Sequence, residues 1–456
     1  MQKVDDHPLS LLMWSASRLN VLPVSGRCNL RCVYCSHQGN PPELLLPRLP
    51  IMTKDELAEA IRFLDPARKI VIGESATRIS EGEPLLYPEI WSVLEEIRRL
   101  FPDAVIQITT NGTFLDEGVA QRLAELKPLE LVVSVNSVHV ESRRRLMGDP
   151  HPERILSGLE NLAKWNVAYT GSMVLIPAIT GWEDITTTIE FLADRQCLVV
   201  RCLMPGFTRW TPPAVARCCP QLEEWQAVKP RVRAIGEKSG IPVTTEPAIW
   251  SLDPERRLSA RIAGIIAGSP ADQAGLRGGD EVIAVGSGLV GSRVDAFEKV
   301  RNARDPAVQV RRQGQILNSR ILKAPNSASG LVFDYDLPLS QVQQIQRLAA
   351  DPTAMLLTSE LAAPLIQAVF EQADGDHRRV QVAANEFWGG NIACAGLLTV
   401  GDLARTYRVF REQEPGMKIR RLLVPGRGFD HYGRDIQGIN LYHLQDVTGV
   451  PVRCAQ

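Results

Sequence analysis

The stretch Cys28-Asn29-Leu30-Arg31-Cys32-Val33-Tyr34-Cys35 places three of the chain's nine cysteines close together near its start. An odd number of cysteines does not fit a closed disulfide framework. The first residues contain acids early and too short an apolar run for an export signal. We therefore expect a reducing, cytoplasmic setting, in which a tight cysteine cluster indicates a metal site rather than a disulfide.

The C-x3-C-x2-C spacing suggests which metal group these cysteines hold. Three thiolates on one loop can bind three irons of a cubane [4Fe–4S] cluster and leave the fourth iron open, whereas electron-transfer clusters usually take four cysteines. Two simpler readings stay open. The three thiols could be reduced core cysteines, or they could belong to a zinc site that lacks its fourth ligand, although zinc loops prefer paired C-x2-C motifs.

Around the cysteines, strand-like and helix-like stretches alternate through about the first 250 residues. Thr53 reads as the N-cap of a helix, with Glu56 completing a capping box. Strands that alternate with helices of 10–15 residues predict repeated βα units and a parallel sheet, in a full or partial (β/α) barrel. The expected strands are 19–24, 105–108, 131–135 and 173–176, and the expected helices are 53–64, 116–126, 152–165 and 182–193.

The cysteine motif, with Asn29-Leu30 inside it and Tyr34 before its last cysteine, resembles that of the radical SAM superfamily. The resemblance covers roughly residues 18–250. It implies a [4Fe–4S] cluster on Cys28, Cys32 and Cys35, with S-adenosylmethionine (SAM) on the open iron. Reductive cleavage of SAM would give a 5′-deoxyadenosyl radical that abstracts hydrogen from a substrate, with an electron from a donor such as flavodoxin or ferredoxin.

Later motifs follow in the order that the superfamily uses. Glu81-Gly82-Glu83-Pro84 resembles the GGEP motif, with Glu81 in place of the first glycine, and Thr109-Thr110-Asn111-Gly112 resembles the TTNG stretch. Read alone, Asn111-Gly112 is a plain turn, and Ser134 and Asn136 at the next strand end could be structural. The resemblance implies these SAM contacts: Tyr34, Gly82, Glu83, Pro84, Thr110, Asn111, Ser134 and Asn136. It assigns no residue to catalysis on the substrate.

Residues 251–324 predict a small β-rich domain. The sequence GSPADQAGLRGGD (268–280), followed by the apolar run 281–285, resembles a bacterial PDZ domain. Such domains bind extended peptides by β-augmentation. Residues 256–323 contain 12 basic and 6 acidic residues, net +6, which favours an acidic or carboxylate-bearing partner. No clear carboxylate-binding loop precedes Arg261, so the domain could instead be a spacer.

Residues 325–456 predict an α+β C-terminal domain. The stretches 385–389 (NEFWG) and 395–399 (AGLLT) resemble the signature of an uncharacterised bacterial module, the domain of unknown function number 512. In a bacterial group this module accompanies a PDZ-like domain and a radical SAM domain. Asn385, Trp388, Gly389 and Gly390 could line a ligand pocket there, or they could form a glycine-rich turn.

Composition restricts the partners. Lys and Arg number 51 and Asp and Glu 52, which gives a net charge of −1, so we expect no global grip on nucleic acid. No apolar run approaches the ~18 residues of a membrane helix, so we expect no membrane partner. The domains are therefore expected at residues 1–250 (radical SAM), 251–324 (PDZ-like) and 325–456 (C-terminal).

The favoured function is radical SAM chemistry on a peptide or protein substrate, since the PDZ-like segment could position one. One alternative is the same chemistry on a small metabolite or cofactor precursor. Another is a non-catalytic iron–sulfur protein that senses redox state. A second cluster on Cys197, Cys202, Cys218 and Cys219 is a weaker possibility, because two of these cysteines are adjacent and the remainder pack well as small apolar residues.

Overall fold

The computed structural model describes residues 8–36, 39–41, 44, 50–74, 80–248, 258–430 and 432–455. Its chain divides into two compact units, and each is described separately here. The first comprises most residues up to 241, and the second comprises residues 242–456 with the short segments 206–209 and 221–229. None of the described helices is both long and apolar enough to cross a bilayer.

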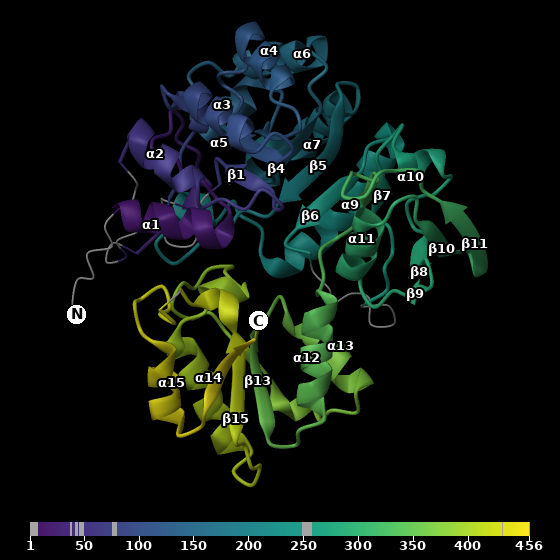
Figure 1. Cartoon of the computed structure of the whole chain (residues 1–456). Helices are drawn as coiled ribbons and strands as arrows, with labels where there is room; N and C mark the ends of the chain where they lie inside the picture. The colour runs from purple at the N-terminus through teal and green to yellow at the C-terminus, as the bar shows by residue number, and fades with distance from the viewer. Residues whose placement is uncertain are drawn as a thin grey trace. The chain divides into compact units, whose positions relative to one another are not determined.

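A six-stranded sheet in sequential order, β1-β2-β3-β4-β5-β6, organises the first part of the chain (Figure 1). Neighbouring strands from β1 to β5 pair in parallel. This confirms the parallel α/β sheet, and its open order fits a partial barrel. The strands are β1 (Ile70–Ile72), β2 (Ile106–Thr110), β3 (Leu129–Ser134), β4 (Tyr169–Val174), β5 (Cys197–Leu203) and β6 (Val243–Glu246).

Helices connect these strands because their apolar residues repeat at helical spacing. In α3, for example, Ile90, Val93, Leu94 and Ile97 are buried on one face. The predicted capping box of Thr53 and Glu56 is present. The helices are α1 (Pro8–Trp14), α2 (Lys54–Ile61), α3 (Ile90–Leu100), α4 (Glu117–Glu125), α5 (Val140–Met147), α6 (Arg154–Lys164), α7 (Pro177–Ala193), α8 (Pro213–Ala216) and α9 (Leu222–Ser239), with the π-helix η1 (Ser15–Leu19) and the 3-10 helix η3 (Pro84–Leu86).

The expected strand at 19–24 is wrong. Leu19 closes η1, and Asn20 follows in the left-handed conformation with φ 60°. Only one bridge remains, from Val21 to Val71 of β1. Pro23 has no N–H group with which to extend the ladder. This segment therefore enters the cysteine loop as a short extended strip beside β1.

In the second unit, residues 258–332 form the small β-rich portion that the sequence predicts. One sheet has the order β11-β10-β8-β9, and a separate pair joins β12 to β7 in antiparallel fashion. Within the mostly apolar run 261–266, only the two residues of β7 form a strand. The elements are β7 (Gly264–Ile265), α10 (Pro270–Gln273), β8 (Glu281–Val285), β9 (Gly288–Leu289), α11 (Arg293–Asn302), β10 (Ala307–Arg312), β11 (Gln315–Arg320) and β12 (Leu331–Val332).

The remainder of this unit contains a second parallel sheet, in the order β14-β13-β15-β16. Helices α12 and α13 lie on one side of it and α14 and α15 on the other (Figure 1). Because its strands alternate with helices, it is α/β and not the expected α+β. The elements are α12 (Leu339–Ala349), β13 (Ala354–Ser359), α13 (Ala363–Gln372), β14 (Val380–Ala383), α14 (Val400–Gln413), β15 (Arg421–Pro425), α15 (Leu441–Thr448) and β16 (Val452–Ala455).

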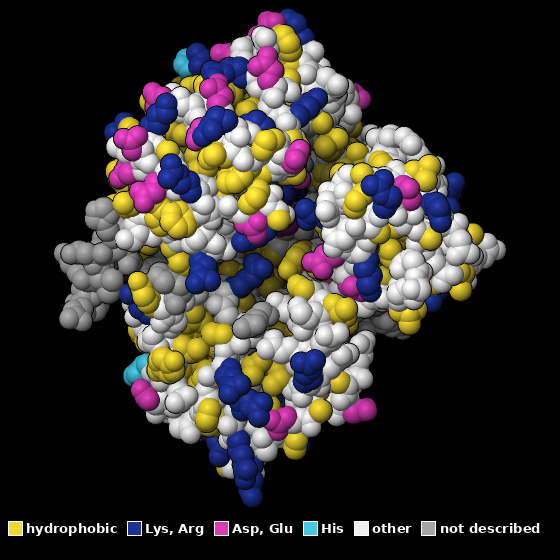
Figure 2. All heavy atoms as spheres, in the orientation of Figure 1, with side chains coloured by type: hydrophobic (Ala, Val, Ile, Leu, Met, Phe, Trp, Pro, Cys, Tyr) yellow, Lys and Arg dark blue, Asp and Glu magenta, His cyan; other side chains and the backbone are white. Residues whose placement is uncertain are grey.

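On the face that Figure 2 draws, basic and acidic side chains are interspersed over the helices of the first sheet. This distribution agrees with the near-zero net charge of the chain. A field of one sign would be needed to steer a polyanion to that face.

Candidate active site at the strand ends of the first sheet

The cysteine loop is fixed by backbone hydrogen bonds to the last turn of α5. Arg31 N donates to Met147 O at 2.9 Å, and Val33 N donates to Leu146 O at 2.8 Å. Within the loop, Cys35 N donates to Cys32 O at 3.1 Å. Cys28 is exposed, while Cys32 and Cys35 are partly buried. The loop is therefore held in place by its backbone.

Burial and mutual repulsion resist ionisation of Cys28 and Cys32. Burial, with smaller contributions from the neighbouring Cys35 and Cys28, raises the pKa of Cys32 to about 11, although a hydrogen bond with Tyr34 acts in the opposite direction. Burial likewise raises the pKa of Cys28, while Leu30 N–H and the Asn111 amide, 3.5 and 3.9 Å from Cys28 Sγ, act in the opposite direction. Thiols of this kind ionise when a metal supplies the compensating positive charge.

Among the described residues, no group of three or more His, Cys, Asp or Glu side chains converges on a point that one metal ion could occupy. A cubane cluster makes a different demand, because each of its irons takes its own thiolate. Three coupled but separate thiols on one loop fit that donor set.

Gly82 packs against the backbone immediately before the cysteines. Gly82 N donates to Ser25 O, and Glu83 N donates to Arg27 O, each at 2.8 Å. A Cβ atom at position 82 would lie 1.8 Å from Arg27 O. Only glycine fits at that separation, so the glycine of the predicted GEP motif has a steric cause. Pro84, also predicted, begins η3 and is buried.

Glu83 joins this segment to the carboxyl end of β2. Its carboxylate accepts hydrogen bonds from Thr110 Oγ1 and Asn111 N, each at 2.7 Å. Burial raises the pKa of Glu83 to about 7, although these hydrogen bonds favour its charged form. Glu83 therefore holds the Thr110-Asn111 turn, and through it the side chain that faces Cys28.

Asn111 completes the connection back to the cysteine loop. Its Nδ2 donates to Asn29 Oδ1 at 2.8 Å, and Asn29 Nδ2 donates to Thr113 Oγ1 at 2.9 Å. Gly112 follows with φ 80°. The structure thus brings together the predicted Cys28, Gly82, Glu83, Thr110 and Asn111, from three separate parts of the sequence.

Glu81, which stands where the motif has its first glycine, performs a structural task. Its carboxylate oxygens accept hydrogen bonds from Val24 N at 2.9 Å and Gly73 N at 3.2 Å. It therefore ties the strip before the cysteine loop to the end of β1. Burial raises the pKa of Glu81 to about 8.

The two residues predicted at the end of β3, Ser134 and Asn136, form contacts with neighbouring parts of the protein. Ser134 is partly buried, and its backbone carbonyl accepts a hydrogen bond from Arg143 Nη1 at 3.2 Å. Asn136 is buried with φ 59°, and both ends of its amide are engaged: Oδ1 accepts from Val174 N at 2.7 Å and Nδ2 lies 3.3 Å from Met147 Sδ. Asn136 thereby joins β3 to β4.

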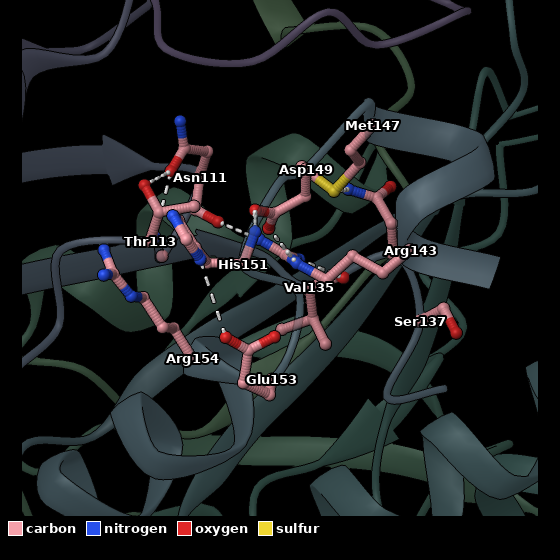
Figure 3. Close-up of polar contacts among 12 residues, drawn as sticks. Asn111, Thr113, Val135, Ser137, Arg143, Met147, Asp149, His151, Glu153 and Arg154 are labelled. Carbon is pink, nitrogen blue, oxygen red and sulfur yellow. Dashed lines mark hydrogen bonds and ion pairs between the residues drawn. The ribbon is translucent and has the colours of Figure 1, made fainter. Parts of the chain in front are cut away.

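Sequence reasoning missed Arg143, which is fully buried beside the site (Figure 3). Its guanidinium donates to Asp149 Oδ2 at 2.8 Å, to Asn111 O at 2.7 Å and to Val135 O at 2.7 Å. It therefore fixes the turn after β2 to the turn after β3. In sequence it stands in the run Arg143-Arg144-Arg145, which resembles an exposed basic helix face, so no local signal separates it from its neighbours.

Tyr34 lies beside Cys32, and burial together with that thiol raises the pKa of Tyr34.

Two of the four cysteines considered for a second cluster lie inside the first sheet. Cys197 and Cys202 are buried in β5, and Cys197 Sγ accepts a hydrogen bond from Gly171 N at 3.3 Å. In the described ranges they join no metal-binding group. They pack as small apolar side chains.

Residues 22–192 match the protein-family model described as the radical SAM superfamily. This part of the chain is a radical SAM domain. The match begins before the cysteine loop, ends with α7, and contains every residue of the network described above. It confirms the resemblance for this domain; it does not reach the PDZ-like segment or the C-terminal segment.

Curated relatives align with the same region. A GTP 3′,8-cyclase from Paenarthrobacter nicotinovorans is 32% identical over 149 residues, which cover 32% of this chain and 38% of the relative. An AdoMet-dependent heme synthase from Methanosarcina barkeri is 29% identical over 187 residues, which cover 40% of this chain and 49% of the relative. The chain therefore spans half or less of the length of these two relatives.

Among solved structures, Streptococcus suis SuiB bound to its precursor peptide SuiA aligns with TM-score 0.41 and 18% identity over 51% of this chain and 49% of that one. A structure titled anSMEcpe with bound AdoMet aligns with TM-score 0.39 and 16% identity over 49% of this chain and 63% of that one.

The radical SAM family uses a [4Fe–4S] cluster and SAM. The residues present fit these groups. Three thiols on one loop provide the cluster's donor set, and Gly82 lets the GEP segment lie directly against the backbone that precedes this loop.

Proposed function

We propose that this chain is a radical SAM enzyme whose cluster is held by Cys28, Cys32 and Cys35. A bound cluster and SAM would supply reductive cleavage to a 5′-deoxyadenosyl radical, which abstracts hydrogen from a substrate. The observation that carries the proposal is the chain of contacts from Gly82 and Glu83 through Asn111 to Cys28. A protein that merely stored a cluster would not need it.

The residues of this network position the site rather than react. Glu83 fixes the turn at Thr110 and Asn111 by two hydrogen bonds of 2.7 Å. Arg143 holds the carbonyl groups of Asn111 and Val135 at the ends of β2 and β3. We propose that SAM lies along these strand ends, against Tyr34, Gly82, Pro84, Ser134 and Asn136. Parallel α/β barrels carry their active sites at this end.

We propose a peptide or protein as the substrate, positioned by the PDZ-like segment. The support is the small β-rich fold of residues 258–332, its net positive charge and its sequence motif. The named relatives favour a second candidate, a small metabolite or cofactor precursor, since their names specify GTP and heme chemistry.

Iron content and electron paramagnetic resonance (EPR) of the anaerobically reconstituted chain test the proposal. We expect about four irons per chain and a SAM-induced change in the EPR signal of the reduced cluster. Cys28→Ala, Cys32→Ala and Cys35→Ala should each lose both, while Cys197→Ala should keep both. A triple cysteine variant that still bound four irons would refute the ligand assignment. An intact cluster that ignored SAM would favour a redox-sensing protein.

A further inference from the structure

In the C-terminal parallel sheet, the connections run in opposite directions from the neighbouring strands β13 and β15. From β13 the chain passes through α13 to β14 on one side, whereas from β15 it passes through α15 to β16 on the other. The helices after these two neighbouring strands therefore diverge. In open α/β sheets, ligands bind at such a switch point, outside the carboxyl ends of the strands.

A cavity of about 690 Å³ lies at this position. It is lined by the ends of β13 and β15 and by apolar side chains of α12 and α13, among them Ile345, Leu348, Leu365 and Ile366. A volume of this size suits a small organic molecule, and such sites are mostly apolar with a few placed polar groups. The four residues suggested by the sequence, from Asn385 to Gly390, do not line it. Asn385 is instead bonded to Leu397 O and Trp388 N.

Two buried hydroxyl groups line the cavity at the end of β13. Thr358 is 0% exposed and Ser359 is 1% exposed. Neither Thr358 Oγ1 nor Ser359 Oγ has a hydrogen-bond partner among the described residues. Leaving a buried hydroxyl unpaired costs about 1–3 kcal/mol, so two of them among the residues that line one cavity indicate partners supplied by a ligand.

The electrostatics of the cavity favour an anionic group near these hydroxyls. The ten-residue helix α13 begins four residues after Ser359, and its N-cap, Ala362, has no side chain that could cap it. A helix N-terminus attracts negative charge. Arg427, which follows β15, adds an exposed guanidinium to the lining.

The carboxylates that also line the cavity are engaged by the protein. Asp334 pairs with Lys229 at 2.8 Å, and Asp336 accepts hydrogen bonds from the backbone N–H groups of Arg293 and Val294 at 2.9 and 3.1 Å. Glu246 also takes part in a hydrogen bond, ion pair or other electrostatic interaction within the protein. Their charges therefore oppose an anion at β13 less than free carboxylates would.

We propose that this cavity binds a small organic molecule with an apolar body and one anionic head, a carboxylate or a phosphate monoester. The head lies at Thr358, Ser359 and the first turn of α13, with Arg427 beside it, and the apolar body lies against α12 and α13. This is a second ligand site. It lies outside residues 22–192, which match the radical SAM family model, and does not depend on the cluster.

Isothermal titration of the full-length protein with octanoate, octyl phosphate and octan-1-ol tests the site. The three probes share one apolar body, so their affinities isolate the contribution of the head. We expect one site per chain, with at least one of the two anions binding about tenfold or more tightly than octanol. The tighter of the two anions identifies the head group.

Variants that preserve volume locate the binding. Thr358→Val, Ser359→Ala and Arg427→Gln should each reduce affinity for the preferred anion about three- to tenfold and leave octanol affinity unchanged. Because neither hydroxyl has a partner in the described part of the chain, Thr358→Val and Ser359→Ala should not lower the unfolding temperature. Thr406→Val on α14 and Arg421→Gln outside the cavity are matched controls and should bind as the unmodified chain does.

Two results would overturn the assignment. In one, neither anion binds more tightly than octanol. In the other, the anion preference survives in all three cavity variants, which would place anion binding elsewhere. A fall in unfolding temperature for Thr358→Val, with binding unchanged, would show that the hydroxyl stabilises the fold rather than a ligand.

Discussion

At the scale of single residues, the site depends on a few groups whose chemistry admits no near substitute. Gly82 lies against Arg27 O because it has no Cβ. Glu83 bonds to both Thr110 and Asn111, and Arg143 reaches carbonyl groups from two strand ends. Each joins segments that are distant in sequence, so a change at one of them should be felt at the cysteine loop.

Gly82→Ala should weaken SAM binding at least about tenfold while the chain remains folded. The added methyl group would overlap Arg27 O and push the GEP segment away from the cysteine loop. SAM titration of the reconstituted protein, followed by EPR, measures the effect. Gly118→Ala in α4 is the matched control, because its added Cβ meets nothing closer than 3.5 Å. Equal SAM affinity in the two variants would contradict this role of Gly82.

Arg143→Met should lower the free energy of unfolding by about 3–5 kcal/mol, because it leaves Asp149 buried without its partner. Arg144→Met in the same helix breaks an exposed pair with Glu141 and should cost less than about 1 kcal/mol. Urea denaturation of both variants in the absence of iron gives the comparison. Similar losses in the two would mean that the buried network contributes little.

The raised pKa of Glu81 makes stability depend on pH. The folded chain keeps a proton on Glu81 up to about pH 8, whereas the unfolded chain releases it near the ordinary value of 4.5. The unfolded state therefore binds fewer protons in this range, and the free energy of unfolding should fall as pH rises from about 4.5 to 8.

Glu81→Gln should make that fall shallower. It should also lower stability at every pH, since one of its two acceptor oxygens is lost. Urea titrations at several pH values give the slope, with the exposed Glu59→Gln as control. An unchanged slope in Glu81→Gln would show that Glu81 titrates as an ordinary exposed carboxylate.

Sequence motifs anticipated the local members of the site but not the group that links them. Cys28, Gly82 and Asn111 stand in recognisable short patterns, and the structure brings them together. Arg143 has no pattern of its own, because its burial follows from how α5 packs on the strand ends. Likewise, nothing in the local sequence predicts that the Asn136 amide contacts Val174 and Met147.

At the scale of elements, strong local signals gave correct predictions and weak ones did not. The capping box placed the start of α2 at the correct residue. The apolar run at 19–24 failed as a strand because η1 occupies its beginning and Pro23 interrupts its ladder. In the apolar run 261–266, only the two residues of β7 form a strand, which pairs with β12.

Thr53→Ala should cost about 1 kcal/mol of stability, the usual value of an N-cap side chain. Thr53 Oγ1 accepts a hydrogen bond from Glu56 N, and Glu56 Oε2 accepts one from Thr53 N. Thermal and urea unfolding measure the loss, with Lys54→Ala in the same turn as the control. A loss no larger than that of the control would mean that the box is not needed to start α2.

At the scale of the whole molecule, two parallel sheets each present their strand ends to a candidate site. The first belongs to the radical SAM domain of residues 22–192. The second lies in residues 354–455. The sequence predicts an α+β domain there, but its helices and parallel strands alternate, so it is α/β. The domain boundaries at residues 250 and 324 are proposals. The pairing of β12, at residues 331–332, with β7 crosses the second boundary.

The central claim is that this chain initiates radical chemistry from SAM, and 5′-deoxyadenosine is its direct product. The protein would be reconstituted anaerobically, reduced with dithionite and mixed with SAM, and the nucleoside would be quantified by mass spectrometry. We predict 5′-deoxyadenosine from the unmodified chain and from Cys454→Ala, and none from Cys32→Ala. An intact cluster that yields no 5′-deoxyadenosine and whose EPR signal does not respond to SAM would contradict the account.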